Sequence, residues 1–292
     1  MTRNTLPYCA VMLAAMLAIS CGTDSSNPNS TGNGDTASSA SANAGTAETT
    51  VDEGAQFKYD MVIGSIPIPF DIMTGLKSAD LHYMKDAMNT TSNSAKYSNN
   101  TSKAVNLGIY GGDLAYCITY EQYSEVGNYL KSAKKLADDL SIPIAFDQKA
   151  LSMFQKYKDN KDSLEKLVFR SYIQVDKTLK SNERLGLASL VVTGGWIEGL
   201  YTTTKNLNNA PKSEKTKLLY QKIWEQKFHT KQLLGLMNEF KSTDADFEMI
   251  VSGIESISNV YKNLEKKGQV NEKEVAEITQ KISELRNKIT AN

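Results

Sequence analysis

Two stretches of this chain carry almost no charge and are rich in glycine, and they constrain the fold more than any other feature. Residues 104–120 contain a single charged side chain, Asp113, and residues 185–204 contain a single one, Glu198. Because a helix that is apolar on nearly every face is buried, each stretch predicts a central helix. Glycine inside a helix costs about 1 kcal/mol relative to alanine, so clustered glycines indicate that the two backbones cross closely. These glycines are Gly108, Gly111, Gly112, Gly186, Gly194, Gly195 and Gly199.

The second stretch also has the length of a membrane span, which needs about 20 apolar residues. Glu198 lies near its middle, together with four threonines and four glycines. A charge at the centre of a spanning helix costs about 3 kcal/mol. We therefore expect a buried helix of a globular domain and not a span.

From about residue 57 onward, apolar residues recur with the period of a helix, and the alternation typical of strands is almost absent. The pattern predicts an all-α, multi-helix bundle. A first short helix is expected from an extended entry at 66–69 to about Ala79; residues 80–88 continue or restart it, and 89–100 form a loop. Longer helices are expected at 101–140 (with a break near Tyr123 as an alternative), 147–158, 161–181, 183–207, 213–241, 244–267 and 272–290.

The last two of these helices carry the clearest apolar stripes. Their apolar residues are spaced alternately by three and four positions, as in packed helix pairs. A Lys-Lys-Gly sequence at 266–268 separates them, so we expect a C-terminal antiparallel helical hairpin, with packing on the bundle core favoured over an exposed coiled coil. Asp147, Ser213 and Asn271 are expected N-caps, the last in a capping box with Glu274. The stripes are Ile250, Ile254, Ile257, Tyr261 and Leu264, then Val275, Ile278, Ile282, Leu285 and Ile289.

The N-terminus has the parts of a secretory signal peptide. Arg3 precedes an uncharged apolar run that is too short to span a bilayer. Residues 17–22, Leu-Ala-Ile-Ser-Cys-Gly, resemble the lipobox of bacterial lipoproteins, although Ala18 stands where leucine is usual. We therefore predict cleavage of residues 1–20 and lipidation of Cys21. The rest of residues 21–56 is poor in apolar side chains and predicts a disordered tether to a single helical domain at 57–292.

Charge and cysteine content argue against several classes of protein. The chain has 33 basic and 33 acidic residues, and residues 57–292 hold 32 and 28 of them. This small surplus is scattered along helices, so we expect no nucleic-acid partner. Cys9 leaves with the signal peptide and Cys21 is acylated, which leaves Cys117 without a disulfide partner. Its apolar surroundings in the sequence predict a buried, inert thiol.

No motif predicts a cofactor or a metal ion. Residues 244–255 place acids at several positions of an EF-hand loop, but Met249 stands where that loop needs glycine. Acids in a first helical turn are favoured in any case by the helix dipole. His82 and His229 each lack a second histidine at a ligand spacing. We therefore expect no cofactor.

The stretches 106–114 (Asn-Leu-Gly-Ile-Tyr-Gly-Gly-Asp-Leu) and 194–201 (Gly-Gly-Trp-Ile-Glu-Gly-Leu-Tyr) resemble those of an uncharacterised family of all-helical lipoproteins from Bacteroidetes. The resemblance extends over most of residues 60–290. It implies an all-helical domain in the cell envelope, and it implies no particular activity.

The two isolated carboxylates are the strongest candidates for a functional site. A carboxylate in apolar surroundings must be paired, hydrogen-bonded or protonated. We therefore expect Asp113 and Glu198 to lie on neighbouring helices, within one polar cluster or lining one ligand pocket. Helical spacing places several aromatic residues near them. The candidate aromatic residues are Tyr110, Tyr116, Tyr120, Trp196 and Tyr201.

Three interpretations of this cluster are open. In the first, tyrosine hydroxyls, threonines and Lys205 satisfy both acids within the core. In the second, the tyrosines line a pocket in which one acid binds a polar or cationic ligand. In the third, Asp113 or Glu198 is the general acid/base of an envelope enzyme. The first is favoured, so we expect a binding or structural protein held on the outer membrane by its lipid anchor, with a small polar ligand or an envelope protein as further possible partners.

Overall fold

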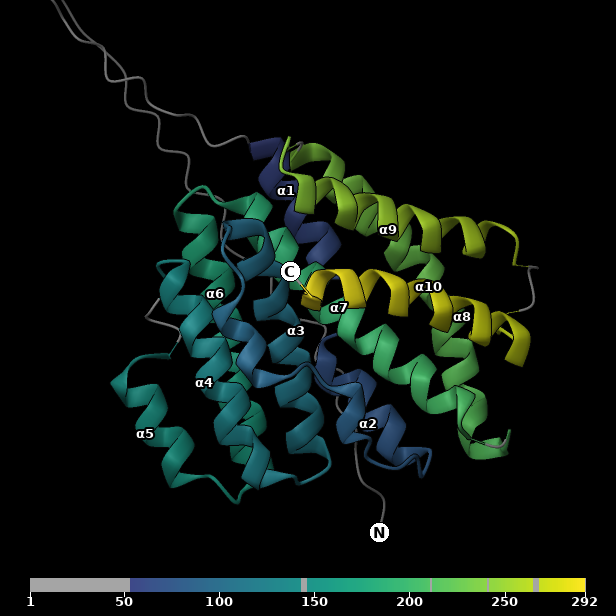
Figure 1. Cartoon of the computed structure of the whole chain (residues 1–292), viewed down its shortest axis with the longest axis horizontal. Helices are drawn as coiled ribbons and strands as arrows, with labels where there is room; N and C mark the ends of the chain where they lie inside the picture. The colour runs from purple at the N-terminus through teal and green to yellow at the C-terminus, as the bar shows by residue number, and fades with distance from the viewer. Residues whose placement is uncertain (1–52, 143–145, 211, 241, 265–267, 292) are drawn as a thin grey trace, which may run out of the picture. The chain divides into compact units, whose positions relative to one another are not determined.

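The structure, a computed structural model, describes residues 53–142, 146–210, 212–240, 242–264 and 268–291. In these ranges the regular structure is helical throughout, with no strand, so the predicted all-α fold is confirmed (Figure 1). None of the helices in these ranges combines the length and the hydrophobicity that crossing a membrane requires. The helices are α1 (Glu53–Ile63), α2 (Pro69–Ser78), α3 (Asn100–Thr119), α4 (Tyr123–Asp139), α5 (Gln148–Lys156), α6 (Lys161–Ser181), α7 (Leu185–Asn208), α8 (Glu214–Met237), α9 (Ala245–Lys262) and α10 (Glu272–Ala291), with short 3₁₀ turns η1 (Lys85–Ala87), η2 (Thr91–Ala95) and η4 (Asn238–Phe240).

Helices α3 and α7 form the centre of the domain, and the two charge-poor stretches lie in them. Every residue of α3 from 104 to 119 and of α7 from 193 to 204 is buried. A Cβ atom on Gly108 would lie 1.9 Å from the carbonyl oxygen of Val191, and one on Gly194 would lie 1.9 Å from that of Val105. Only glycine permits this approach of the two backbones, so the predicted close crossing is confirmed.

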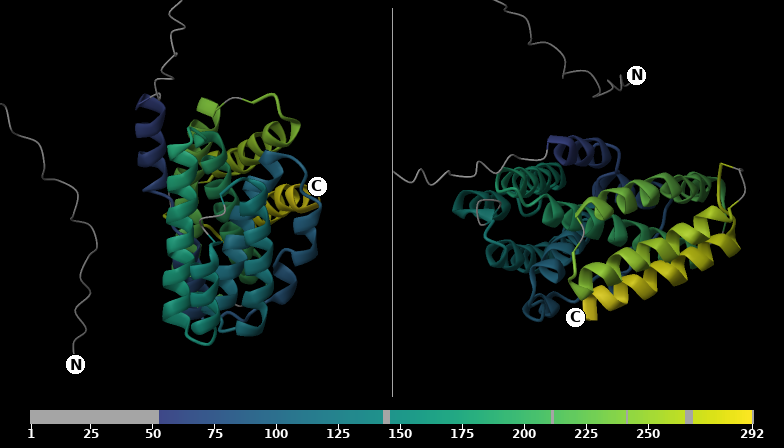
Figure 2. Two further views of the ribbon diagram at one scale, coloured as in Figure 1. Left: turned by 90° about the vertical axis from the view of Figure 1, so that its left-hand side faces the viewer. Right: turned by 90° about the horizontal axis from the view of Figure 1, so that it is seen from above.

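The other helices cover this central pair. Helix α2 packs on both α3 and α7, as does α6, while α4 packs on α3. Helix α10 lies against α7 and against α9, and the two C-terminal helices run side by side as the predicted hairpin (Figure 2). Both of their apolar stripes face the core. Helix α10 is therefore placed to bring side chains to α7 from outside the central pair.

The ends of several helices are set by local hydrogen bonds that the sequence predicts. Asp147 accepts the backbone N–H of Ala150 at 2.7 Å. At the start of α8 the backbone N–H of Ser213 donates to Thr216, whose N–H donates back to the serine hydroxyl. Asn271 accepts the N–H of Glu274 at 3.0 Å, and the glutamate accepts the N–H of Asn271 at 2.7 Å. All three predicted N-caps are confirmed, because capping depends on near neighbours alone.

Two boundary predictions need correction, and a third is decided in favour of its alternative. Helix α1 begins at Glu53, so its first residues lie inside the segment expected to be tether. Residues 80–88 do not continue α2, because Asp80 takes a left-handed φ of 57° and Leu81 donates its N–H to the carbonyl of Leu76, which ends the helix. The chain then runs irregularly through η1 and η2 to α3. The helix expected at 101–140 is broken near Tyr123, as the alternative predicted. Glu121 has a left-handed φ of 59°, which ends the first of the two helices.

Candidate functional site

The structure brings Asp113 and Glu198 together, with an arginine that the sequence did not single out. The Nε of Arg286 donates to Oε2 of Glu198 at 2.7 Å, and its Nη2 donates to Oε1 at 2.9 Å. The Glu198 side chain is fully buried, and that of Arg286 is 6 % exposed. This is a two-point ion pair in the core, the geometry for which the planar guanidinium is suited.

Asp113 lies beside this ion pair. Burial raises the pKa of its carboxyl well above the usual value, and the neighbouring Glu198 raises it further, through charge and a hydrogen bond, against the opposing effect of Arg286. The backbone N–H of Asn89 donates to Oδ2 at 3.2 Å. Gly112 permits the approach, because a Cβ there would lie 2.9 Å from the Cβ of Glu198. One arginine thus faces two buried carboxyls, and the raised pKa of Asp113 favours its protonated form.

This arrangement makes stability depend on pH in a predictable direction. Asp113 has a folded-state pKa above its unfolded value of about 3.8, so the folded protein binds the proton more tightly. The stabilisation of the folded state by this tighter proton binding is fully present below the unfolded-state pKa. It is lost as the pH rises toward the folded-state pKa. We expect chemical denaturation to show unfolding free energy falling above pH 4 in the native protein relative to Asp113→Asn, by up to about 1.4 kcal/mol per pH unit. A difference curve that is flat, or that rises with pH, would contradict a protonated Asp113.

Arg286 also connects this cluster to the irregular segment between α2 and α3. Its Nη2 donates to the carbonyl oxygen of Ala87 at 2.9 Å, and its guanidinium lies 4.3 Å from the ring centroid of Tyr201. One sequence signal could have revealed it: only four of the 33 basic residues are arginines, and Arg286 follows Leu285 of the apolar stripe on the face of Ile282. Lys205, the cation that we expected, instead pairs with Asp86 at 3.0 Å.

The tyrosines near the acids bond to the backbone of the 79–99 segment. Tyr110 donates to the carbonyl of Thr90 at 2.9 Å, and Tyr120 donates to that of Leu81 at 2.8 Å. The hydroxyl of Tyr116 accepts the N–H of Met84 at 2.9 Å. These hydroxyls satisfy carbonyls and amides that lack partners in regular structure. The tyrosines therefore position this segment over α3.

The C-terminal end of α10 is held by amide side chains from the same region. Asn106 donates to the carbonyl of Ile289 at 3.2 Å, and Asn93 donates to that of Thr290 at 3.3 Å. The hydroxyl of Tyr97 also donates to Thr290, at 3.4 Å. These bonds supply partners for carbonyls that a helix end leaves without intrahelical bonds. Together with the bonds of Arg286, these bonds attach α10 to the core. Holding α10 in place is therefore the structural role of the polar cluster.

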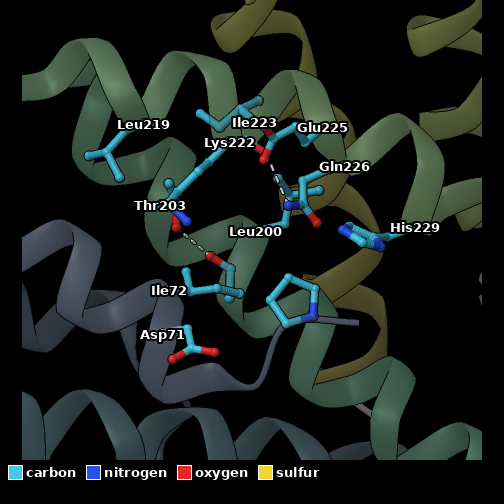
Figure 3. Close-up of a pocket in the computed structure, with 12 residues that line it drawn as sticks. Asp71, Ile72, Leu200, Thr203, Leu219, Lys222, Ile223, Glu225, Gln226 and His229 are labelled. Atoms are coloured by element: carbon cyan, nitrogen blue, oxygen red, sulfur yellow. Dashed lines mark hydrogen bonds between the residues drawn. The ribbon is translucent and has the colours of Figure 1, made fainter. Parts of the chain in front are cut away.

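Two hollows in the described structure lie on either side of Pro67. The smaller, of about 50 Å³, lies between α2, α7 and α8, and its lining includes the polar residues Asp71, Lys222 and His229 beside apolar ones (Figure 3). Burial lowers the pKa of His229, which favours a neutral imidazole. A volume of this size holds one or two water molecules, so we assign it no ligand. The larger hollow, of about 200 Å³, is apolar and contains Trp196 among its lining residues.

The remaining sequence candidates are placed as follows. Cys117 is buried, and burial raises the pKa of its thiol to about 12, as an inert cysteine requires. Asp244 caps α9 by accepting the N–H of Phe247 at 3.0 Å. Across the described ranges no group of three His, Cys, Asp or Glu side chains is arranged to hold a metal ion. Cys21 lies outside the described residues.

Comparison of the chain with models of protein families, with curated proteins and with solved structures finds no match.

Proposed function

We propose that this protein is a lipoprotein of the cell envelope, anchored by acyl chains on Cys21, and that its helical domain acts by binding and not by catalysis. The burial of Asp113 and Glu198, at 1 % and 0 % exposed, argues against catalysis by these acids, and the apolar hollow lined by Trp196 supports binding. A substrate could reach neither acid unless α10 left the core. A general acid/base must come within hydrogen-bond reach of its substrate, so this geometry favours a structural role for both carboxylates.

The proposed anchor is supported by sequence alone. Residues 17–22 resemble a lipobox, and the two glycine-rich stretches resemble those of helical Bacteroidetes lipoproteins. Two or more acyl chains hold a protein stably on a bilayer where one does not. Gly22 follows the cysteine at the position where aspartate signals inner-membrane retention in enteric bacteria, so we place the protein on the outer membrane.

The anchor is tested by replacing the acylated residue. Cys21→Ala should abolish incorporation of a fatty-acid analogue and move the protein from the membrane to the soluble envelope fraction. Cys9→Ala is the matched control, because it removes the other cysteine of the N-terminal segment and should leave both properties unchanged. Labelled, membrane-bound Cys21→Ala protein would contradict the proposal.

A further inference from the structure

The larger hollow is a groove formed by three elements. Its lining comes from the connection between α1 and α2, from one face of α6 and from one face of α7. On α6, the groove residues lie beside the stripe that faces the core, so this helix has a second apolar face. The lining residues are Ile63, Ile66, Pro67, Ile68, Pro69, Phe70, Phe169, Tyr172, Ile173, Asp176, Val191, Val192, Gly195 and Trp196.

The rim of the groove exposes large apolar side chains to solvent. Phe169 is 45 % exposed and Ile173 is 51 % exposed, and Ile68 faces them from the other wall of the same groove. Contiguous exposed apolar side chains mark binding sites in soluble domains. Pro67 and Pro69 restrict the backbone φ angles of their wall.

We propose that this groove binds one uncharged hydrocarbon chain, such as that of a fatty alcohol or of another neutral lipid. The volume, about 200 Å³, exceeds the roughly 150 Å³ at which a dry apolar cavity takes up benzene. The wall is concave, whereas a bilayer surface is met by a protruding apolar face.

The charges around the groove set the class of ligand. None of its lining residues is Lys, Arg or His, and the nearby Lys180 ammonium is already paired with Asp60 and Asp176. The one ionisable carboxylate, Asp176, already accepts the hydroxyl of Tyr59 at 2.5 Å and lies 3.4 Å from the Lys180 ammonium. A fatty-acid carboxylate is therefore disfavoured relative to an alcohol of the same length.

The test uses the mature chain, residues 21–292, with Cys21→Ala to keep it unacylated. The uncharged dye N-phenyl-1-naphthylamine should bind saturably, with increased fluorescence, and decanol should displace it. Phe169→Ser should weaken dye binding about tenfold, since it removes a large apolar contact. Phe228→Ser is the matched control, because Phe228 is exposed to a similar extent, 53 %, but belongs to α8 and not to the groove.

Several outcomes would overturn the proposal. These are the absence of saturable binding, equal loss in both phenylalanine variants, and displacement by decanoate as effective as by decanol. Sedimentation showing a dimer that Phe169→Ser dissociates would assign the groove to a second copy. Co-flotation with phospholipid vesicles that the same variant abolishes would assign it to a bilayer surface. This inference rests on the proposed binding function and adds the class of ligand. The dye experiment tests the groove alone, so its result is independent of whether Cys21→Ala releases the protein from membranes.

Discussion

Arg286→Ala is expected to lower the free energy of unfolding by about 3–5 kcal/mol, because it leaves Glu198 buried without its cation, beside the carboxyl of Asp113. Domains of this kind are stable by about 5–15 kcal/mol in total, so the loss is a large fraction. It should appear in chemical denaturation at neutral pH as an earlier midpoint with an unchanged slope. The carbonyl of Ala87 also loses its donor.

Two matched variants distinguish the two possible causes of this loss, which are the unpaired charge of Glu198 and the missing packing of the arginine side chain. Asp113→Asn should cost far less, because asparagine resembles the neutral form that we assign to this residue. The double variant Glu198→Leu/Arg286→Met should recover most of the loss, since a buried ion pair is often replaced by apolar side chains without penalty. If Arg286→Ala and the double variant are equally unstable, the ion pair is not the cause.

Alanine at either crossing glycine, Gly108 or Gly194, is expected to destabilise the domain by about 3 kcal/mol or more. The added Cβ would meet a backbone carbonyl oxygen at 1.9 Å, and backbone cannot rotate away as a side chain can. Helices α3 and α7 must then separate, which disturbs every layer packed on them. Thermal unfolding followed by circular dichroism at 222 nm measures the effect.

The chain contains a control for this substitution. Gly127 lies in α4, and a Cβ there would meet nothing within 4 Å. Gly127→Ala should therefore stabilise the protein by about 0.5–1 kcal/mol through the ordinary helix preference of alanine. Destabilisation of similar size at Gly108 and Gly127 would show that the close crossing does not limit stability.

Most of the fold could be predicted because its signals are local. The charge-poor stretches identified α3 and α7, and the alternating three and four spacing identified the hairpin of α9 and α10. Both patterns can be recognised from one sequence because each involves only residues that are neighbours along one helix. The irregular segment 79–99 was harder to predict, since its backbone is held by hydroxyls of tyrosines in α3 and at its C-cap, more than twenty residues away in most cases.

The candidate site was predicted only in part, for the same reason. An isolated acid in an apolar stretch predicts that some partner must satisfy it, but it does not identify that partner. The partner of Glu198 is 88 residues away in the sequence. Lys205, nearer in sequence, was the natural expectation. The apolar groove was missed because its walls come from three separate elements, and the second apolar face of α6 is interrupted by Tyr172 and Asp176.

The position of Arg286 also has a consequence for the order in which the domain folds. Its carboxylate partner precedes it by 88 residues, and its carbonyl partner, Ala87, precedes it by 199. Helix α10 is the last helix of the chain, so the arginine reaches the acids only when the C-terminal residues join the core. Until α10 packs, Glu198 lacks the cation that pairs with it in the core, so the preceding helices cannot complete their packing. Folding of this domain is therefore coupled to the late arrival of a single side chain.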